Sequence, residues 1–382
     1  APLTQALHEL EAQTKPVAWP EMQSVLRSGL GAHYSELEIE PEALAAASLA
    51  QVHRARIIST GEHVVVKGQY PDLVALLDED FNTVVKMLRL ARWIPGSQDF
   101  DSWLATLHTQ LLAEVDYPRE HRMAKAMSDG LSRHAALQNA PVAIQIPQFW
   151  PELCSTGVLT MEYIEGHRAG SAKVAALPQA TRNELGKLML RLFFAEVFDL
   201  GLVQTDPNFG NYLINDDGSE LTLLDFGSVF ELDQSVRTAL CNTILAGLIN
   251  DEARLETALV ALGCLKSDTG EVAKVTFKAF ISNLLEPLRP PEALQPEHVN
   301  AEGLYSWGRS ELVKRTSQQV VRSLMNKEFA IPSGDFAMVA RKLTGVFTFI
   351  AVLNAEFNGY DIVKPYLDQI TASGGDRQMS SN

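Results

Sequence analysis

Cysteine is scarce in this sequence, and a long apolar run is absent. The three cysteines, Cys154, Cys241 and Cys264, are odd in number and widely spaced, so they provide neither a disulfide framework nor a Cys-x-x-Cys metal site. This usage fits a reducing compartment. The nearest approach to a membrane-spanning run, residues 345–355, is shorter than the stretch of about 18 apolar residues that such a helix needs. We therefore expect a chain that does not cross a membrane but can lie against one.

Basic residues and several catalytic signatures are also in short supply. Lys and Arg total 32 against 47 for Asp and Glu, which gives a net charge of −15. Such a chain repels phosphate backbones, so we exclude nucleic acid as its main partner. The sequence contains no His-Glu-x-x-His motif, no Gly-x-Ser-x-Gly elbow and no Walker phosphate loop. These absences argue against the zinc peptidases, serine hydrolases and P-loop nucleotidases that carry such motifs.

What is present is an ordinary globular composition with 46% hydrophobic and 21% charged residues. At about 100–200 residues per domain, a chain of 382 residues predicts two domains or lobes. We place a β-rich first lobe over residues 1–165 and a helical second lobe over residues 166–382. The expected helices lie within residues 3–30 (two short ones), 72–93, 101–130, 180–200 and from 234 onward, and the expected strands at 44–58, 63–67, 158–164, 212–214 and 221–224. His53 and His63 are expected at the surface of a hairpin.

The most informative segment is Gln204–Asn211, followed by Asp225-Phe226-Gly227. Phosphoryl transfer needs a carboxylate that orients the attacking group and hard oxygen ligands that hold Mg²⁺ against the phosphates. We expect Asp206 to orient an attacking hydroxyl or water, and Asn211 and Asp225 to hold the metal. The alternative is a loop aspartate that caps a helix and an asparagine that only forms a turn.

A lysine closes the strand that contains three consecutive valines. Lys67 at this place can project into a cleft and bind phosphate oxygens if a carboxylate holds it. Glu120 is the candidate partner, although Pro118 interrupts the helix expected there. The alternatives are a solvent-facing lysine at a strand edge and a solvated helical glutamate.

Alanines stand where kinases have a glycine-rich hairpin turn. The segment Ala45, Ala46, Ala47 and Ser48 has Cβ atoms that restrict the backbone, but Ser48 and the neighbouring N–H groups can still bind an anion. The alternative is a short helix.

Taken together, these motifs make the sequence resemble the ABC1/UbiB family of atypical, protein-kinase-like proteins. The resemblance covers residues 40–230 and rests on five segments: Ala45–His53, Val66–Pro71, Glu114–Glu120, Gln204–Asn211 and Asp225–Gly227. Many bacterial members have a His-x-Asp-x-His-Pro-Gly-Asn loop. The Gln-Thr-Asp-Pro-Asn form found here resembles the mitochondrial coenzyme Q branch and its bacterial relatives.

The resemblance implies an α+β, protein-kinase-like, two-lobed fold with extra helices in the first lobe. It implies ATP or ADP with Mg²⁺ as cofactors. The residue roles that it implies are phosphate binding by Lys67 paired with Glu120, catalysis by Asp206, metal binding by Asn211 and Asp225, and adenine binding by the backbone of a hinge that contains Met161, Glu162 and Ile164.

The resemblance further implies an ATPase or a small-molecule or lipid phosphotransferase that supports ubiquinone biosynthesis. An isoprenoid lipid or quinone precursor would be a partner, and the location would be cytoplasmic or peripheral at the inner membrane. Two alternatives stay open. One is a nucleotide-gated lipid-binding protein with little turnover. The other is a small-molecule phosphotransferase of the aminoglycoside or choline kinase type.

One motif of the family does not occur in the sequence, namely the Lys-x-Gly-Gln segment that folds over the active site. Either the chain is truncated before it or this member lacks it. Without it, we expect a more open cleft and faster nucleotide turnover than in a version that carries it. Lys67 and Glu120 are far apart in sequence, and residues 72–110 are expected to form extra helices that cover one side of the cleft.

Overall fold

The computed structural model describes residues 16–46, 49–90, 104–105, 108–109, 112–113, 115–206, 208–265, 269–316 and 334–379. The chain divides into two compact units. The first comprises residues 1–128, 146–165 and 224–228, and the second comprises residues 129–145, 166–223 and 229–382. The first helix expected before residue 16, the pair Ala47 and Ser48, and Glu114 lie outside the described residues.

The first unit is built on a four-stranded antiparallel sheet of order β1-β2-β3-β5. Its elements are α2 (Trp19–Leu30), η1 (Gly31–Glu36), β1 (Leu37–Ala46), β2 (Ala50–Ile57), β3 (His63–Gln69), α3 (Leu73–Leu90), α5 (Tyr117–Ser132, which continues into the second unit), η2 (Pro151–Leu153) and β5 (Val158–Glu162). The expected hairpin is present, since β2 and β3 pair around the turn at Thr60-Gly61. Strand β3 is therefore an inner strand, bonded to β2 and β5.

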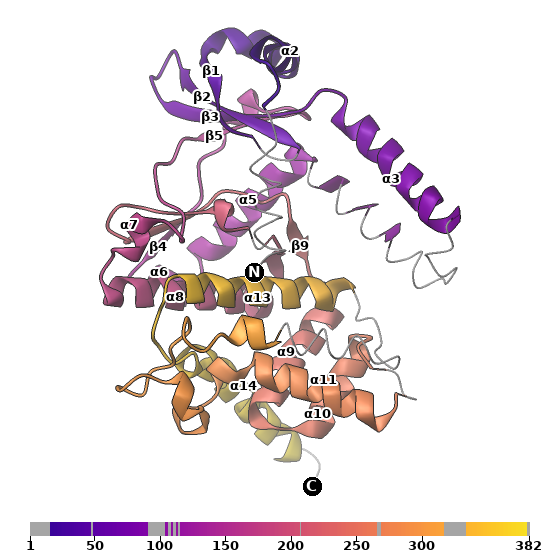
Figure 1. The fold of residues 1–382 in the computed structure, drawn as a ribbon, viewed down its shortest axis with the longest axis vertical. Coiled ribbons are helices and arrows are strands. Elements are labelled where there is room, and N and C mark those ends of the chain that lie inside the picture. Colours follow the sequence, from indigo (N-terminus) through magenta and orange to yellow (C-terminus); the bar gives the residue numbers. More distant parts are fainter. Residues whose placement is uncertain are drawn as a thin grey trace. The chain divides into compact units, whose positions relative to one another are not determined.

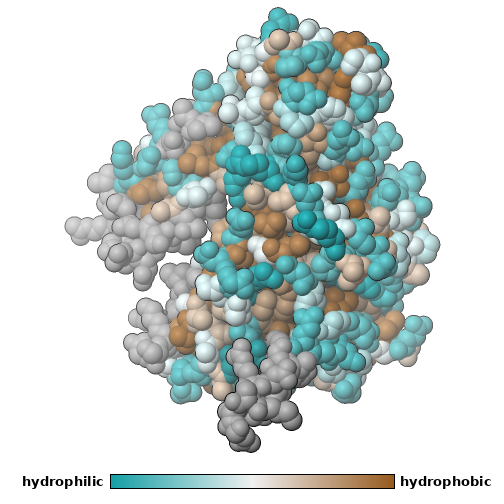
Figure 2. Space-filling view, turned by 180° about the vertical axis from the view of Figure 1, so that it is seen from behind, coloured by the Kyte–Doolittle hydropathy of each residue, from teal (hydrophilic) through white to brown (hydrophobic). Residues whose placement is uncertain are grey.

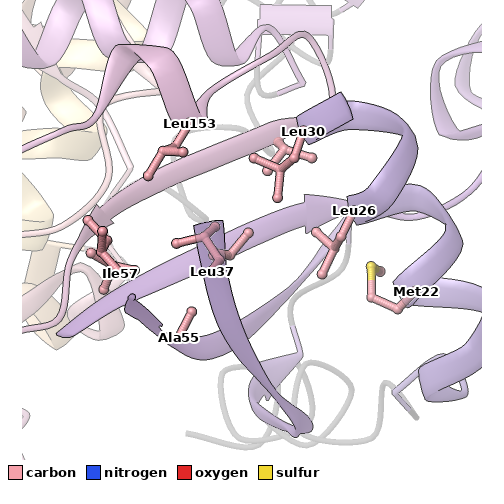
Figure 3. Close-up of a cluster of buried hydrophobic side chains, with 10 residues drawn as sticks. Met22, Leu26, Leu30, Leu37, Ala55, Ile57 and Leu153 are labelled. Carbon is pink, nitrogen blue, oxygen red and sulfur yellow. The ribbon is translucent and has the colours of Figure 1, made fainter. Parts of the chain in front are cut away.

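Helix α2 packs on one face of this sheet because its apolar side chains recur every three to four residues. Met22, Leu26 and Leu30 are buried in a cluster with side chains of the strands (Figure 3). Gly68 of β3 permits this close approach, since a Cβ there would lie 2.7 Å from Leu26 Cδ2. Val66 belongs to the same cluster. Because side chains alternate along a strand, its neighbour Lys67 emerges on the opposite face of the sheet.

Helix α3 is present within the region where extra helices are expected, and in Figure 1 it extends away from the strands rather than across the sheet.

The surface position expected for His53 is wrong. Its side chain is fully buried, its Nδ1 lies 2.8 Å from the Glu40 carbonyl oxygen, and its Nε2 lies 3.0 Å from Gln51 Nε2. Burial lowers the pKa of His53, which favours the neutral ring.

The second unit is mainly helical. Its elements are α6 (Ala135–Gln138), β4 (Ala143–Gln145), α7 (Ala172–Ala175), α8 (Gln179–Phe194), the π-helix η3 (Ala195–Leu200), β6 (Leu202–Gln204), η4 (Phe209–Asn211), β7 (Tyr212–Ile214), β8 (Glu220–Leu223), β9 (Val229–Glu231), α9 (Gln234–Ile249), α10 (Glu252–Ala261), α11 (Glu271–Leu284), η5 (Glu286–Leu288), η6 (Pro291–Ala293), η7 (Pro296–His298), α13 (Gly334–Val352) and α14 (Tyr360–Met379). Two small sheets accompany them, ordered β4-β8-β7 and β6-β9.

Helices α8 and α13 form the centre of this unit. A Cβ at Gly186 of α8 would lie 3.2 Å from Ile350 Cγ2 of α13, so the glycine lets the two helices approach closely. Phe193, Phe347 and Phe349 are buried on these helices. The strands β6 and β7 flank the loop that contains Asp206, which is the candidate catalytic loop. This short and polar loop belongs to the same unit as the packed helices.

Among the residues that the structure describes, none of the helices combines the length and the apolar character needed to cross a bilayer. On the face shown in Figure 2, hydrophilic and hydrophobic residues are interleaved.

Candidate active site

Lys67 leaves β3 toward two carboxylates of the same unit. Its Nζ lies 3.2 Å from Glu120 Oε2 and 3.6 Å from Asp225 Oδ2. The Glu120 side chain is 1% exposed and that of Lys67 is 16% exposed, so water screens the pair weakly. The structure thus brings together three residues that the sequence singled out, from a strand, a helix and the Asp-Phe-Gly segment.

Charge and burial shift the pKa values of these groups. Burial opposes the charge on Lys67, but the carboxylates of Glu120 and Asp225 outweigh it and raise the pKa of the lysine. Burial raises the pKa of Glu120 to about 7, against the pull of Lys67. Lys67 therefore stays a cation at neutral pH, as a phosphate-binding group must.

Glu120 reaches this place because helix α5 begins at Tyr117. Pro118 is the second residue of the helix, where a missing N–H costs nothing, so it starts the helix rather than interrupting it. Asp116 Oδ1 accepts a hydrogen bond from the Arg119 N–H at 2.9 Å and so caps the first turn. The cap and the proline fix the turn from which Glu120 projects.

The same turn holds the Asp-Phe-Gly segment. Glu120 Oε1 lies 3.5 Å from the backbone N of Phe226, and Arg119 Nη1 donates to the Gly227 carbonyl oxygen at 2.8 Å. Phe226 is buried, with its ring edge-on to Phe149 at 6.4 Å between centroids. Asp225 Oδ1 in turn accepts from the Gly227 N–H at 2.9 Å. Helix α5 therefore fixes Asp225 relative to Lys67.

Sequence reasoning did not assign a role to Gln69, which supports this arrangement. Its Nε2 donates to the carbonyl oxygens of Val115 and Thr156, the latter at 3.2 Å, and the side chain is buried. It thereby joins the end of β3 to the segment just before α5. The signal was available, since a glutamine two residues after Lys67 at the end of an apolar strand is unusual without a buried partner.

The expected adenine hinge lies at the end of β5. Met161 is buried and Glu162 exchanges backbone and side-chain hydrogen bonds with Gln148. Within the described parts of the chain, no backbone hydrogen bond involves Ile164. Its N–H is therefore available to a ligand, whereas the Glu162 N–H is already used. Ala45 and Ala46 end strand β1 and pair with Val52 and Gln51.

In the second unit, the Asp206 carboxylate accepts hydrogen bonds from other residues of the same loop. Its Oδ2 accepts from Asn211 Nδ2 at 2.6 Å, and its Oδ1 accepts from the Asn208 N–H at 3.2 Å. Asn208 Oδ1 caps the next turn by accepting from the Gly210 N–H at 2.8 Å. This use of the Asn211 amide N–H₂ leaves its carbonyl oxygen as a ligand for a cation.

The donor set fits a magnesium nucleotide. No group of three or more His, Cys, Asp and Glu side chains gathers around a metal position in the described ranges. Mg²⁺ in phosphoryl-transfer sites needs only one or two protein carboxylates or amides, because phosphates and water complete its shell. The Tyr117 hydroxyl is buried without a hydrogen-bond partner among the described residues, and its ring centroid lies 5.2 Å from Lys67 Nζ. A polar ligand bound next to the lysine would supply one.

The second unit also contains a cavity of about 550 Å³ between α8 and α14. Its lining includes Lys187 and Arg191 as well as Asp199 and Asp361, and it does not include Asp206. None of the candidate catalytic or metal-binding residues lines this cavity, so it is not part of the candidate active site.

Comparisons with known proteins identify the family to which this sequence is similar. Residues 9–259 match the model of the ABC1 atypical kinase-like domain. The mitochondrial atypical kinase COQ8 of Schizosaccharomyces pombe is 30% identical over 340 residues, which cover 88% of this chain and 52% of that protein. The mitochondrial atypical kinase COQ8 of Saccharomyces cerevisiae is 26% identical over 339 residues, which cover 88% of this chain and 63% of that protein. The chain thus spans between half and two thirds of the length of these relatives.

A solved structure supports the fold. The complex of Rv3197 with erythromycin from Mycobacterium tuberculosis matches with a TM-score of 0.66 and 22% identity, over 95% of this chain and 85% of that chain. Similarity at this level of identity concerns the fold alone. Together with the family match, it confirms the α+β, kinase-like fold class, with a four-stranded sheet in the first unit and mostly helices in the second.

Proposed function

The chain belongs to the ABC1 atypical kinase-like family, and from this premise we propose that it binds ATP or ADP with Mg²⁺ and cleaves or transfers the terminal phosphoryl group of ATP. The single observation that carries the proposal is the position of Lys67 between the carboxylates of Glu120 and Asp225. A lysine paired with a helical glutamate beside the aspartate of an Asp-Phe-Gly segment is the arrangement that phosphoryl transfer by kinases requires.

The proposed roles follow the chemistry of each group. Lys67 binds phosphate oxygens as a point charge, and Asp225 binds Mg²⁺ once the nucleotide draws Lys67 away from it. Asn211 is proposed as the second magnesium ligand, and Asp206 as the carboxylate that orients the attacking oxygen. When bound, Mg²⁺ neutralises charge that develops on the phosphate oxygens.

The remaining proposed contacts concern the two ends of the nucleotide. The free N–H of Ile164 supports adenine binding by the hinge that also contains Met161 and Glu162. The alanine-rich segment, of which Ala45 and Ala46 are described, is proposed to lie against the phosphates. Ala47 and Ser48 share this proposal on the sequence pattern alone.

We propose that the reaction serves isoprenoid-quinone biosynthesis, with an isoprenoid lipid or quinone precursor as partner at a membrane surface. The Gln-Thr-Asp-Pro-Asn form of the catalytic loop, which resembles the coenzyme Q branch, and the similarity to two COQ8 proteins named as mitochondrial support this part. A cytoplasmic location, or one peripheral at the inner membrane, belongs to the same proposal.

The test is Mg²⁺-dependent ATP hydrolysis by this chain, with and without a detergent-solubilised isoprenoid phenol. Asp225→Asn removes the proposed metal ligand. Asp217→Asn makes the same chemical change at an exposed hairpin turn and serves as the matched control. Hydrolysis that is lost in the first variant, kept in the second and increased by the phenol is the expected result.

Other results would select other functions. Nucleotide that raises the melting temperature without any hydrolysis would favour a nucleotide-gated lipid-binding protein. Transfer of phosphate to a soluble alcohol would favour a phosphotransferase of the aminoglycoside or choline kinase type. A melting temperature that no nucleotide changes, in the presence or absence of Mg²⁺, would overturn the proposal.

A further inference from the structure

Lys342 of α13 is a fully buried cation within the second unit. Its side chain is 2% exposed and that of its partner Glu196 is 0% exposed. An ammonium group has three N–H donors, and three different side chains accept them here. The Glu196 carboxylate lies at 3.1 Å, Gln204 Oε1 at 3.4 Å and the Tyr212 hydroxyl at 3.4 Å from Lys342 Nζ.

Two of these acceptors stand at the two ends of the candidate catalytic loop. Gln204 is the last residue of β6, just before the segment that contains Asp206, and Tyr212 is the first residue of β7, directly after Asn211. The Tyr212 hydroxyl also donates to Gln204 Oε1 at 3.1 Å. One cation and one hydrogen bond therefore join the strand that enters the loop to the strand that leaves it.

The neighbouring residue of α13 binds the loop itself. Arg341 Nη2 donates to the Thr205 carbonyl oxygen at 2.9 Å, and its Nε donates to the same oxygen at 3.1 Å. Thr205 directly precedes Asp206. Two consecutive residues of one helix thus fix three positions of the loop and its flanks.

Stability alone does not explain a charged group at this place. A buried ion pair gains little over well-packed apolar side chains of similar volume, because desolvation of both charges offsets their attraction. Glu196 lies in the π-helix that continues α8, and π-helical turns are rare and frequent at functional sites. What an apolar pair could not do is bind Gln204 and Tyr212 at once.

We propose that Lys342 is a positioning residue for phosphoryl transfer: it binds both ends of the catalytic loop and so fixes Asp206 and Asn211, while Glu196 balances its charge. The proposal rests on the proposed function, since it assigns the loop its part in the reaction. Positioning of this kind affects turnover strongly, because a displacement of about 1 Å can cost a factor of about 100 in rate.

The test replaces both charges together, by Glu196→Met with Lys342→Met. Removing one alone would leave an unpaired charge in the core and strongly destabilise the unit. The double variant should keep a melting temperature near that of the wild type and lose about 10- to 100-fold in kcat for ATP hydrolysis. The KM for ATP should stay within about threefold, because the nucleotide is held mainly by residues of the first unit.

The matched control is Glu286→Met with Arg315→Met. Glu286 and Arg315 form another ion pair of the same unit, with both hydrogen bonds at 3.0 Å, and they also hydrogen-bond with Tyr305 and Ser310, which lie outside the loop. This control double variant should keep the kcat of the wild type. A double variant at Glu196 and Lys342 that folds and keeps kcat within about twofold of the wild type would overturn the proposal.

Two further measurements keep the proposal open to refutation. If the double variant does not fold, Tyr212→Phe removes one of the three acceptors without a charge change and should lower kcat several-fold. If the wild type hydrolyses no ATP, the proposed function fails, but the order of the loop can still be measured by amide hydrogen exchange of residues 203–213. Exchange there should be faster in the Glu196 and Lys342 double variant than in the control, and equal exchange would refute the positioning role.

Discussion

Lys67 Nζ lies 3.2 Å from the carboxylate of Glu120, although 53 residues separate the two in sequence. Glu120 also accepts from the backbone N–H of Phe226, and Asp225 lies 3.6 Å from the same ammonium. One buried carboxylate therefore links a strand, a helix and the Asp-Phe-Gly segment. We expect any change that weakens the pair to alter the position of both Lys67, the proposed phosphate-binding residue, and the proposed metal ligand.

This relationship predicts the effect of Glu120→Gln. The amide cannot balance the charge of Lys67, which is then left to Asp225 alone, the carboxylate proposed to bind Mg²⁺. We expect ATP hydrolysis to fall by at least about tenfold at saturating nucleotide, which corresponds to about 1.4 kcal/mol of barrier. Glu38→Gln is the control, since it breaks the exposed pair with Arg56 in the same sheet and should leave turnover unchanged. Full activity of the Glu120 variant would contradict the ion-pair role.

The hinge allows a sharper test of nucleotide binding. Ile164→Pro removes the N–H that makes no hydrogen bond in the described structure, while Ile164→Ala keeps it. If this N–H binds the adenine ring, the proline variant should bind ATP about 3- to 10-fold more weakly than the alanine variant, the worth of one hydrogen bond. Isothermal titration with a non-hydrolysable analogue measures this, and melting curves show whether both variants are folded. Equal affinities would remove Ile164 from the adenine contacts.

Much of the first unit could be predicted from the sequence because its signals are local. Three consecutive valines predict a strand, and Thr60-Gly61 predicts the turn that precedes it. In the second unit, the short strands expected at 212–214 and 221–224 around a polar turn correspond to β7 and β8, and β8 begins and ends one residue earlier than expected. In each case the hydrophobic pattern and the turn chemistry point to the same structure.

The expectations that the structure corrects depend on structural context that a local sequence pattern does not show. Pro118 is expected to interrupt a helix, but it occupies the second position of α5, where proline is tolerated. His53 reads as a surface residue, but a carbonyl oxygen and the Gln51 amide allow it to be buried. Lys342 was given no role by the sequence, and only the positions of Glu196 and Tyr212 show that it is a core residue.

The packing of α2 on the sheet predicts a loss of stability rather than of chemistry. Leu26 is fully buried in the cluster of Figure 3, and Leu26→Ala should lower the free energy of unfolding by about 2–5 kcal/mol through lost burial and the cavity left behind. Leu44→Ala in β1 is the matched control, since that side chain is 42% exposed. Urea denaturation monitored by circular dichroism measures both. A change below about 0.5 kcal/mol for Leu26→Ala would mean that α2 does not hold the sheet.

The pH dependence of stability provides a test of the buried pair that involves no substrate. Burial raises the pKa of Glu196 to about 7 from an ordinary 4.5, although Lys342 opposes the shift. The folded state therefore binds this proton more tightly than the unfolded state. The contribution of Glu196 to the free energy of unfolding is thus complete below about pH 4.5 and is lost as the pH rises through about 7. Relative to Glu196→Gln, the wild type should lose up to about 3 kcal/mol over that range.

Glu286 provides the opposite case within the same unit. Burial would raise the pKa of its carboxyl, but hydrogen bonds from Arg315 and Tyr305 outweigh it and lower the pKa. The contribution of Glu286 to the free energy of unfolding should be complete above its ordinary pKa and be lost as the pH falls through its lowered pKa. Urea denaturation at a series of pH values should therefore give slopes of opposite sign for Glu196→Gln and Glu286→Gln, each taken relative to the wild type. Parallel slopes would show that Glu196 is ionised throughout, and that its charge is held by Lys342 strongly enough to overcome the cost of burial.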